Sequence, residues 1–172
     1  MRIILFRHGP AGSRDAARWP ADAERPLTSK GAERTARAAR GLARVAPAIG
    51  AVLTSPLLRA LRSAQLVREE LGVEAPPEVL DALEPGGSFR EVLARLSAFE
   101  SGDVVCLVGH EPDLGKLAGV LVFGAPATTL PLKKAGACII DFVGAIAPGV
   151  GRLHAFLPPR VLRRMAHSKS KV

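Results

Sequence analysis

The chain has 172 residues and a net charge of +8 at pH 7, with 18 arginines among its 24 basic residues. This length fits one domain around a single hydrophobic core. The charge favours anionic partners such as phosphoesters, acidic proteins or nucleic acid, although arginine-rich usage on solvated helix faces would explain it equally well. The aromatic content of 4% and the shortness of every apolar run argue against a base-stacking nucleic-acid surface and a membrane span, so we expect a cytoplasmic protein with neither partner.

The N-terminal part predicts a buried strand, a long loop and a helix. A strand is predicted over residues 2–6, where the run of residues 3–6 is apolar without alternation, as expected when helices cover both faces of a sheet. Residues 9–27 contain two glycines and three prolines, which predicts an irregular loop of a length that is often functional. A helix is predicted from Thr28, whose hydroxyl suits the N-cap position. Its buried side is expected to carry the alanines that recur at helical spacing, namely Ala32, Ala36, Ala39 and Ala43.

A second strand and helix are predicted next. Residues 51–54 form a short apolar run, and Ser55 and Pro56 follow it directly. Serine at the N-cap and proline at the first helical position are typical of a helix start, so we expect a helix from here to about Leu71. Another short strand is predicted at residues 77–80.

The same alternation continues to the C-terminal end. Residues 104–108 predict another buried strand, and Pro112 and Asp113 suit the first turn of a helix that runs to about residue 122. The remaining predictions are an amphipathic helix at 89–99, strands at 137–143 and 151–157, and a short helix after residue 159.

Strands that alternate with helices predict an α/β fold, a three-layer α/β/α sandwich with a mostly parallel central sheet. We expect one domain over residues 1–165 and a basic, disordered tail over residues 166–172. Cys106 and Cys138 each lie in an apolar, strand-like run, where a thiol behaves as a small hydrophobe, so a disulfide framework is not expected.

Three short segments each come just after a predicted strand. They are residues 7–9 with Arg7, His8 and Gly9, residues 55–59 with Arg59, and residues 109–112 with His110. Because ligands bind at the carboxyl ends of strands in open α/β sheets, we expect these groups to converge. Arginine forks match phosphate oxygens, and a neutral imidazole is a competent nucleophile toward phosphorus. The pattern therefore predicts a phosphate site built around a reactive histidine.

Gly9 has a separate part in this prediction. A residue without Cβ lets the backbone approach closely. The neighbouring carbonyl could then accept a hydrogen bond from Nδ1–H of His8, which would turn Nε2 toward the substrate.

These motifs resemble the histidine phosphatase superfamily, which is named for an Arg-His-Gly signature at the end of its first strand. Beyond Arg7-His8-Gly9, the similarity covers residues 25–28, 53–60 and 108–114 in the family's order, and it is greatest to the SixA-type phosphohistidine phosphatases. The resemblance implies a phosphoglycerate mutase-like fold with no metal or other cofactor. It also implies that His8 is the nucleophile, and that Arg7, Arg59, His110 and the Gly9 backbone bind the phosphoryl oxygens.

The remaining charged candidates carry weaker signals. Many members of the superfamily place an acid after a middle strand, and Glu84 lies in about that region, which makes it a candidate general acid. Arg25 could reach the rim of the pocket from the loop, or it could be an exposed or structural ion-pair residue. Arg62 is interpreted as solvated, and His154 and His167 lack metal-ligand spacing.

The function that we expect is a metal-independent phosphatase with a covalent phosphohistidine intermediate, acting on phosphohistidine carried by a protein. A phosphomonoesterase for a small molecule or phosphoserine is the alternative within the enzyme class. A non-catalytic basic module that binds phosphorylated partners or nucleic acid is the alternative outside it. The protein is expected to be a monomer or a weak dimer.

Overall fold

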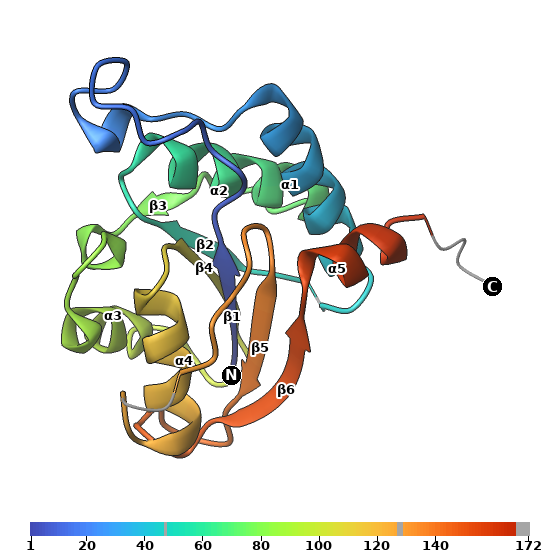
Figure 1. Cartoon of the computed structure of the whole chain (residues 1–172). Coiled ribbons are helices and arrows are strands. Elements are labelled where there is room, and N and C mark those ends of the chain that lie inside the picture. Colours follow the sequence, from blue (N-terminus) through green and yellow to red (C-terminus); the bar gives the residue numbers. More distant parts are fainter. Residues whose placement is uncertain (47, 127–128, 168–172) are drawn as a thin grey trace.

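The computed structural model of the protein describes residues 1–46, 48–126 and 129–167, and its centre is a mixed sheet (Figure 1). In the described part of the chain this sheet has six strands in the order β3-β2-β4-β1-β5-β6. The strands are β1 Arg2–Arg7, β2 Ala51–Thr54, β3 Glu78–Val79, β4 Val104–Gly109, β5 Ala137–Asp141 and β6 Arg152–Leu157. β5 runs antiparallel to β1 and β6, while the pairs among β1 to β4 are parallel. The predicted mostly parallel α/β fold is confirmed.

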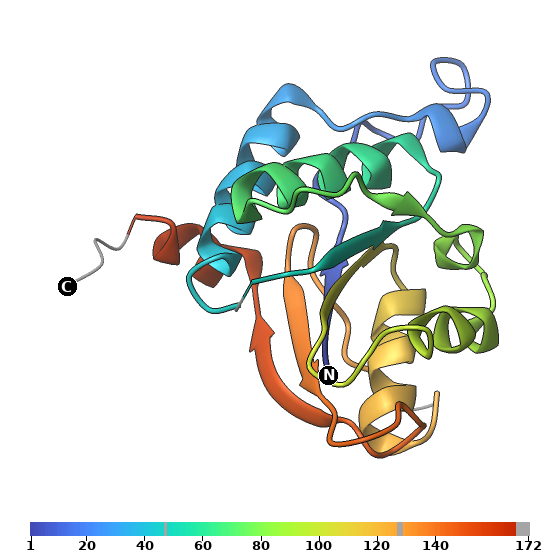
Figure 2. The ribbon, with the colours of Figure 1, turned by 180° about the vertical axis from the view of Figure 1, so that it is seen from behind.

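Helices cover both faces of the sheet (Figures 1 and 2). One face packs against α1 Ser29–Leu42, α2 Leu58–Leu71 and α5 Pro159–Met165. The other packs against α3 Phe89–Leu96 and α4 Asp113–Phe123. Two short 3-10 helices complete the described elements, η1 Asp22–Glu24 and η2 Asp81–Leu83. None of the described helices is long and apolar enough to cross a membrane.

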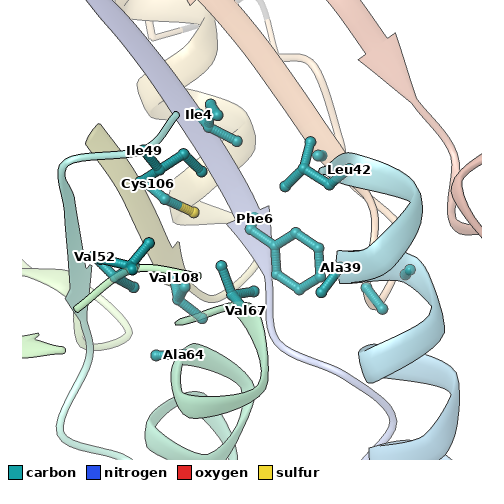
Figure 3. Close-up of a cluster of buried hydrophobic side chains, with 14 of the residues drawn as sticks. Ile4, Phe6, Ala39, Leu42, Ile49, Val52, Ala64, Val67, Cys106 and Val108 are labelled. Carbon is teal, nitrogen blue, oxygen red and sulfur yellow. The ribbon is translucent and has the colours of Figure 1, made fainter. Parts of the chain in front are cut away.

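Strand β1 lies between β4 and β5 and contributes to both hydrophobic layers. Ile4 and Phe6 point toward α1 and α2, where Phe6 lies near Ala39 (Figure 3). Ile3 and Leu5 point into the opposite layer. All four side chains are fully buried, which explains why the strand is apolar without alternation.

Helix α1 begins as predicted but buries a different stripe. The Thr28 hydroxyl accepts a hydrogen bond from the Gly31 backbone N–H at 2.9 Å, so the predicted N-cap is confirmed. The predicted alanine stripe is wrong at Ala43, which is exposed. The buried residues include Thr35 and Gly41, and a Cβ on Gly41 would lie 1.8 Å from the Leu162 carbonyl oxygen. Close backbone packing against α5 therefore decides which side of the helix is buried.

The predicted N-cap at Ser55 is wrong. Helix α2 begins at Leu58, and its N-cap residue Leu57 makes no side-chain capping bond. The Ser55 backbone N–H donates to the Val108 carbonyl at 3.0 Å, so Ser55 continues the sheet contacts of β2. The helix therefore starts later than predicted, which puts Arg59 in its first turn.

Other boundaries differ by a few residues. Helix α3 ends at Leu96, before the predicted end at residue 99, because residues 97–99 form a turn. Strand β5 ends at Asp141, and its last two predicted residues leave the ladder. Of the predicted tail, residues 168–172 lie outside the described residues. Cys106 and Cys138 are free and buried, and burial raises the pKa of each thiol to about 12.

Candidate active site

The carboxyl ends of β1, β2 and β4 meet at one edge of the sheet, where a cavity of about 380 Å³ opens. The strand ends converge as predicted, because β1 and β2 both pair with β4 in parallel. The titratable side chains that line the cavity are Arg7, His8, Arg14, Arg25, Arg59, His110, Glu111 and Lys134. Arg7, His8, Arg59 and His110 are therefore brought together, and the surplus of cations favours an anionic ligand.

His8 is held in one orientation and one protonation state. Its Nδ1 lies 2.7 Å from the Gly9 carbonyl oxygen, as predicted. A carbonyl only accepts, so Nδ1 carries the proton and Nε2 keeps a free lone pair. Burial, followed by the charges of His110 and the nearby arginines, lowers the pKa of His8 from 6.5 to about 3. The ring is therefore neutral at pH 7, which is the nucleophilic form.

Gly9 positions His8. The predicted role of the Gly9 backbone is to bind phosphate, but in the structure its N–H and carbonyl groups both bond to other residues of the protein. The Gly9 N–H donates to Ser63 Oγ at 3.0 Å, and its carbonyl accepts from His8. Both backbone groups are thus engaged inside the protein, and Gly9 does not line the cavity. A Cβ at this position would lie 1.9 Å from Thr35 Oγ1, so only glycine allows this approach to α1.

Arg59 and Arg25 are both held by Asp22, a residue of the long loop that the sequence reasoning missed. Arg59 donates through Nη1 to the Asp22 carbonyl at 2.7 Å and pairs through Nη2 with Asp22 Oδ2 at 2.9 Å. Arg25 Nε donates to Asp22 Oδ1 at 2.8 Å. Arg25 is only 5% exposed and lines the cavity, so it is both an ion-pair residue and part of the pocket wall. The one available signal was the spacing of Asp22 three residues before Arg25.

Ser55 fixes the second histidine. Its Oγ accepts from the Leu57 N–H at 3.3 Å and lies 2.9 Å from His110 Nε2. If the hydroxyl donates to Nε2, His110 carries its proton on Nδ1, which makes Nδ1 a donor. The His8 and His110 ring centroids are 4.9 Å apart. Burial, then the charge of Arg59, lowers the pKa of His110 to about 4.

Three buried nitrogen atoms of the cavity residues have no hydrogen-bond partner among the described residues. They are Arg7 Nε, Arg59 Nε and His110 Nδ1. Buried donors in proteins are nearly always satisfied, and leaving one unsatisfied costs about 1–3 kcal/mol. An oxyanion beside His8 would accept from donors of this kind. This is the strongest sign in the structure that the cavity is built for a phosphoryl group or a similar anion.

The structure does not place Glu84 in this cavity. Glu84 is exposed at the end of η2 and lines a smaller neighbouring pocket. Glu111 lines the main cavity, and its Oε1 accepts from the Leu132 N–H at 2.8 Å. The Leu132 carbonyl in turn accepts from Arg7 Nη1 at 2.8 Å. Burial raises the pKa of Glu111, and its position next to His110 in the sequence was an unused signal.

The other charged candidates lie outside the cavity. Arg62 is exposed and pairs with Glu69 at 3.5 Å, in agreement with the solvated interpretation. His154 contacts Asp141 at the far end of the sheet, and His167 contacts Arg37. In the ranges that the structure describes, no group of three or more His, Cys, Asp or Glu side chains has the arrangement of a metal site.

Asp22→Ala is expected to lower the free energy of unfolding by about 1–2 kcal/mol, because the buried guanidinium groups of Arg25 and Arg59 lose their shared carboxylate. The loss is not larger because the Asp22 side chain is half exposed. Loss of Arg59 positioning should also lower kcat/KM by roughly ten- to hundredfold. Denaturant unfolding and steady-state kinetics measure the two effects. Glu24→Ala removes a carboxylate from the same 3-10 helix and should change neither; equal losses in both variants would contradict the role of Asp22.

Comparison with known proteins gives one consistent result. Residues 3–85 match the family model of the histidine phosphatase superfamily (branch 1). The chain is 34% identical over 134 residues to the phosphohistidine phosphatase SixA of Escherichia coli, covering 77% of this chain and 79% of that protein. It is 42% identical over 139 residues to an uncharacterized protein of Picosynechococcus sp., covering 79% and 82%. A solved structure of the protein histidine phosphatase SixA with tungstate superposes with a TM-score of 0.80 at 29% identity, covering 93% of this chain and 98% of the other.

Proposed function

We propose that this chain, a phosphatase that belongs to branch 1 of the histidine phosphatase superfamily, removes the phosphoryl group from phosphohistidine on a protein. In this proposal His8 is the nucleophile and no metal takes part. The observation that carries this proposal is that three buried donors without a hydrogen-bond partner belong to the residues around His8. The imidazole of His8 is itself neutral and held in one orientation. A phosphoryl group would satisfy donors of this kind while it is attacked.

The reaction takes two steps. In the first, the lone pair of His8 Nε2 forms a bond to phosphorus, and the bond from phosphorus to the substrate imidazole nitrogen breaks. The released electron pair stays on the substrate nitrogen, which takes up a proton from water. The phosphorylated His8 ring keeps its Nδ1 proton on the Gly9 carbonyl. In the second step, water attacks phosphorus, the bond from phosphorus to Nε2 breaks, and its electron pair returns to Nε2, so that neutral His8 is restored. The dihydrogenphosphate that forms loses one proton to solvent and leaves as hydrogenphosphate, which replaces the proton that the substrate nitrogen took from water in the first step.

Charge on the transferred group is stabilised by fixed donors. Arg7 is held by a hydrogen bond at Nη1, and Arg59 is engaged at both Nη atoms, which leaves Nε of each for the phosphoryl oxygens. His110 would donate from Nδ1 because Ser55 occupies Nε2. Donors that are already oriented cost no reorganisation when the transition state forms, and phosphoryl transfer depends mainly on such positioning and electrostatics.

Among the described residues around the cavity, the shortage of acidic side chains that could protonate a leaving group supports a phosphohistidine substrate over a phosphate ester. Of the described carboxyl groups, only Glu111 lines the cavity, and one of its oxygens already accepts from Leu132. An alkoxide leaving group needs a general acid, whereas imidazole leaves more easily. A phosphomonoesterase acting on a small molecule or phosphoserine remains the second candidate, because a cavity of about 380 Å³ has room for more than a phosphoryl group.

The proposal is tested with a histidine-containing phosphocarrier protein phosphorylated by phosphoramidate, compared with O-phosphoserine and p-nitrophenyl phosphate. After subtraction of uncatalysed hydrolysis, kcat/KM for the phosphohistidine protein is expected to exceed that for O-phosphoserine by at least about tenfold, because no acid assists departure of the serine alkoxide. p-Nitrophenolate leaves without an acid, so p-nitrophenyl phosphate reports only whether the site is active. Higher kcat/KM for O-phosphoserine would favour the phosphomonoesterase. Rapid quenching in base followed by mass spectrometry should find the covalent phosphoryl group on His8.

A further inference from the structure

Two cations at the mouth of the cavity have no partner inside the protein. Arg14 and Lys134 both line the cavity and are exposed, and neither side chain makes a hydrogen bond or ion pair with any residue that the structure describes. Arg7, Arg25 and Arg59 differ from them, since each is bonded to Leu132 or Asp22. Arg7 and Arg59, the inner arginines, serve the phosphoryl group in the proposed reaction, while Arg14 and Lys134 are free to bind something else.

In the described part of the chain, no acidic side chain forms an ion pair with Arg14 or Lys134. Asp15 Oδ1 accepts from the backbone N–H groups of Ala17 and Arg18 at 3.0 and 3.4 Å. Asp22 pairs with Arg25 and Arg59, as described above. Burial, followed by repulsion from Arg7 and other arginines, lowers the pKa of Lys134. The mouth of the cavity is therefore a region of positive charge.

A second cavity extends the mouth along the long loop. It measures about 360 Å³ and shares Arg14 and Arg25 with the first cavity. The rest of its lining consists of Asp15, Ala16, Trp19, Pro20 and Asp22. Figure 1 shows this loop projecting past the carboxyl end of β1. The Arg18 guanidinium carbon lies over the Trp19 ring, 5.3 Å from its centroid. Together the cavities offer far more room than a phosphoryl group needs, with apolar surface beside the free cations.

We propose that Arg14, Lys134 and the second cavity, which Trp19 lines, form a docking surface for an acidic stretch of polypeptide that flanks the phosphohistidine. This inference rests on the proposed function. Carboxylates are the complementary partners for an arginine fork and a lysine that lack internal acceptors. A phosphoryl group brings at most two negative charges, which the inner arginines and His110 already meet. The apolar wall at Trp19 would cover the aliphatic parts of the docked segment.

The test uses two phosphohistidine peptides that differ only in their flanking residues, glutamates in one and glutamines in the other. At low ionic strength the wild-type protein is expected to prefer the glutamate peptide by about tenfold in kcat/KM, and added salt should reduce this preference. Arg14→Gln and Lys134→Gln should each reduce it, and the double variant should bring the ratio close to one. Arg152→Gln is the matched control, because it removes the same charge at the opposite end of the sheet, where Arg152 pairs with Asp141 in the ladder.

The outcomes separate the two proposals. Hydrolysis of both peptides without a preference for glutamate would overturn the docking surface and leave the phosphohistidine activity intact. Equal losses on both peptides in Arg14→Gln and Lys134→Gln would also overturn it, because a general structural effect does not distinguish flanking charge. If p-nitrophenyl phosphate is hydrolysed and neither peptide is, the proposed function fails, and the docking surface fails with it.

Discussion

His8→Ala is expected to lower kcat/KM by roughly 10⁴-fold or more, because removal of a nucleophile eliminates the covalent route and leaves only binding and electrostatic stabilisation. Among the residues that the structure describes, none of those that line the cavity is placed to replace it. His110 lies 4.9 Å away between ring centroids, but its Nε2 is engaged by Ser55. Steady-state hydrolysis of the phosphohistidine protein measures the loss.

Oxyanion binding distinguishes the loss of the nucleophile from a damaged site. His8→Ala should still bind tungstate, observed by calorimetry, because the side chains of Arg7, Arg59 and His110 are held by Leu132, Asp22 and Ser55 and not by His8. His154→Ala is the matched control, since that histidine is exposed at the far end of the sheet and should leave kcat/KM unchanged. Activity of His8→Ala within about tenfold of the wild type would contradict the covalent mechanism.

The parts of the molecule that sequence predicted well are those specified by local pattern. The unbroken apolar run before Arg7 predicts a buried strand because both faces of β1 are covered. Convergence of Arg7, His8, Arg59 and His110 followed from a single rule about the carboxyl ends of parallel strands, which required no knowledge of side-chain contacts. Even the hydrogen bond from His8 to the Gly9 carbonyl is local, and it was predicted.

The parts that sequence did not predict depend on contacts between distant segments. Ser55 has the residue type and the following proline of a helix cap, but its backbone belongs to the sheet and its hydroxyl contacts His110, 55 positions away. Asp22 acts through Arg59, 37 positions away. Glu84 was chosen because it follows a middle strand, whereas η2 and the turn after it keep this side chain outside the cavity. Such partners are decided by how the loops fold back over the sheet.

The free energy of unfolding is expected to fall by roughly 3–4 kcal/mol between pH 7 and pH 5, from His8 and His110 together. In the unfolded chain each imidazole takes up a proton near pH 6.5, whereas the folded pKa values are about 3 and about 4. As the pH falls, protons therefore bind the unfolded state first. Each histidine then costs about 1.4 kcal/mol of stability per pH unit until the pH reaches its folded pKa.

Chemical denaturation at several pH values measures this slope, in buffers without phosphate, because a bound oxyanion would stabilise the folded state. The interval from pH 7 to pH 5 is chosen because carboxylates with lowered pKa values, such as Asp22 and Asp141, lose their contribution only at lower pH. His8→Gln should remove about half of the slope. A flat profile for the wild type would mean that His8 and His110 take up protons in the folded protein at the same pH as in the unfolded chain, which would contradict the lowered pKa values of both imidazoles.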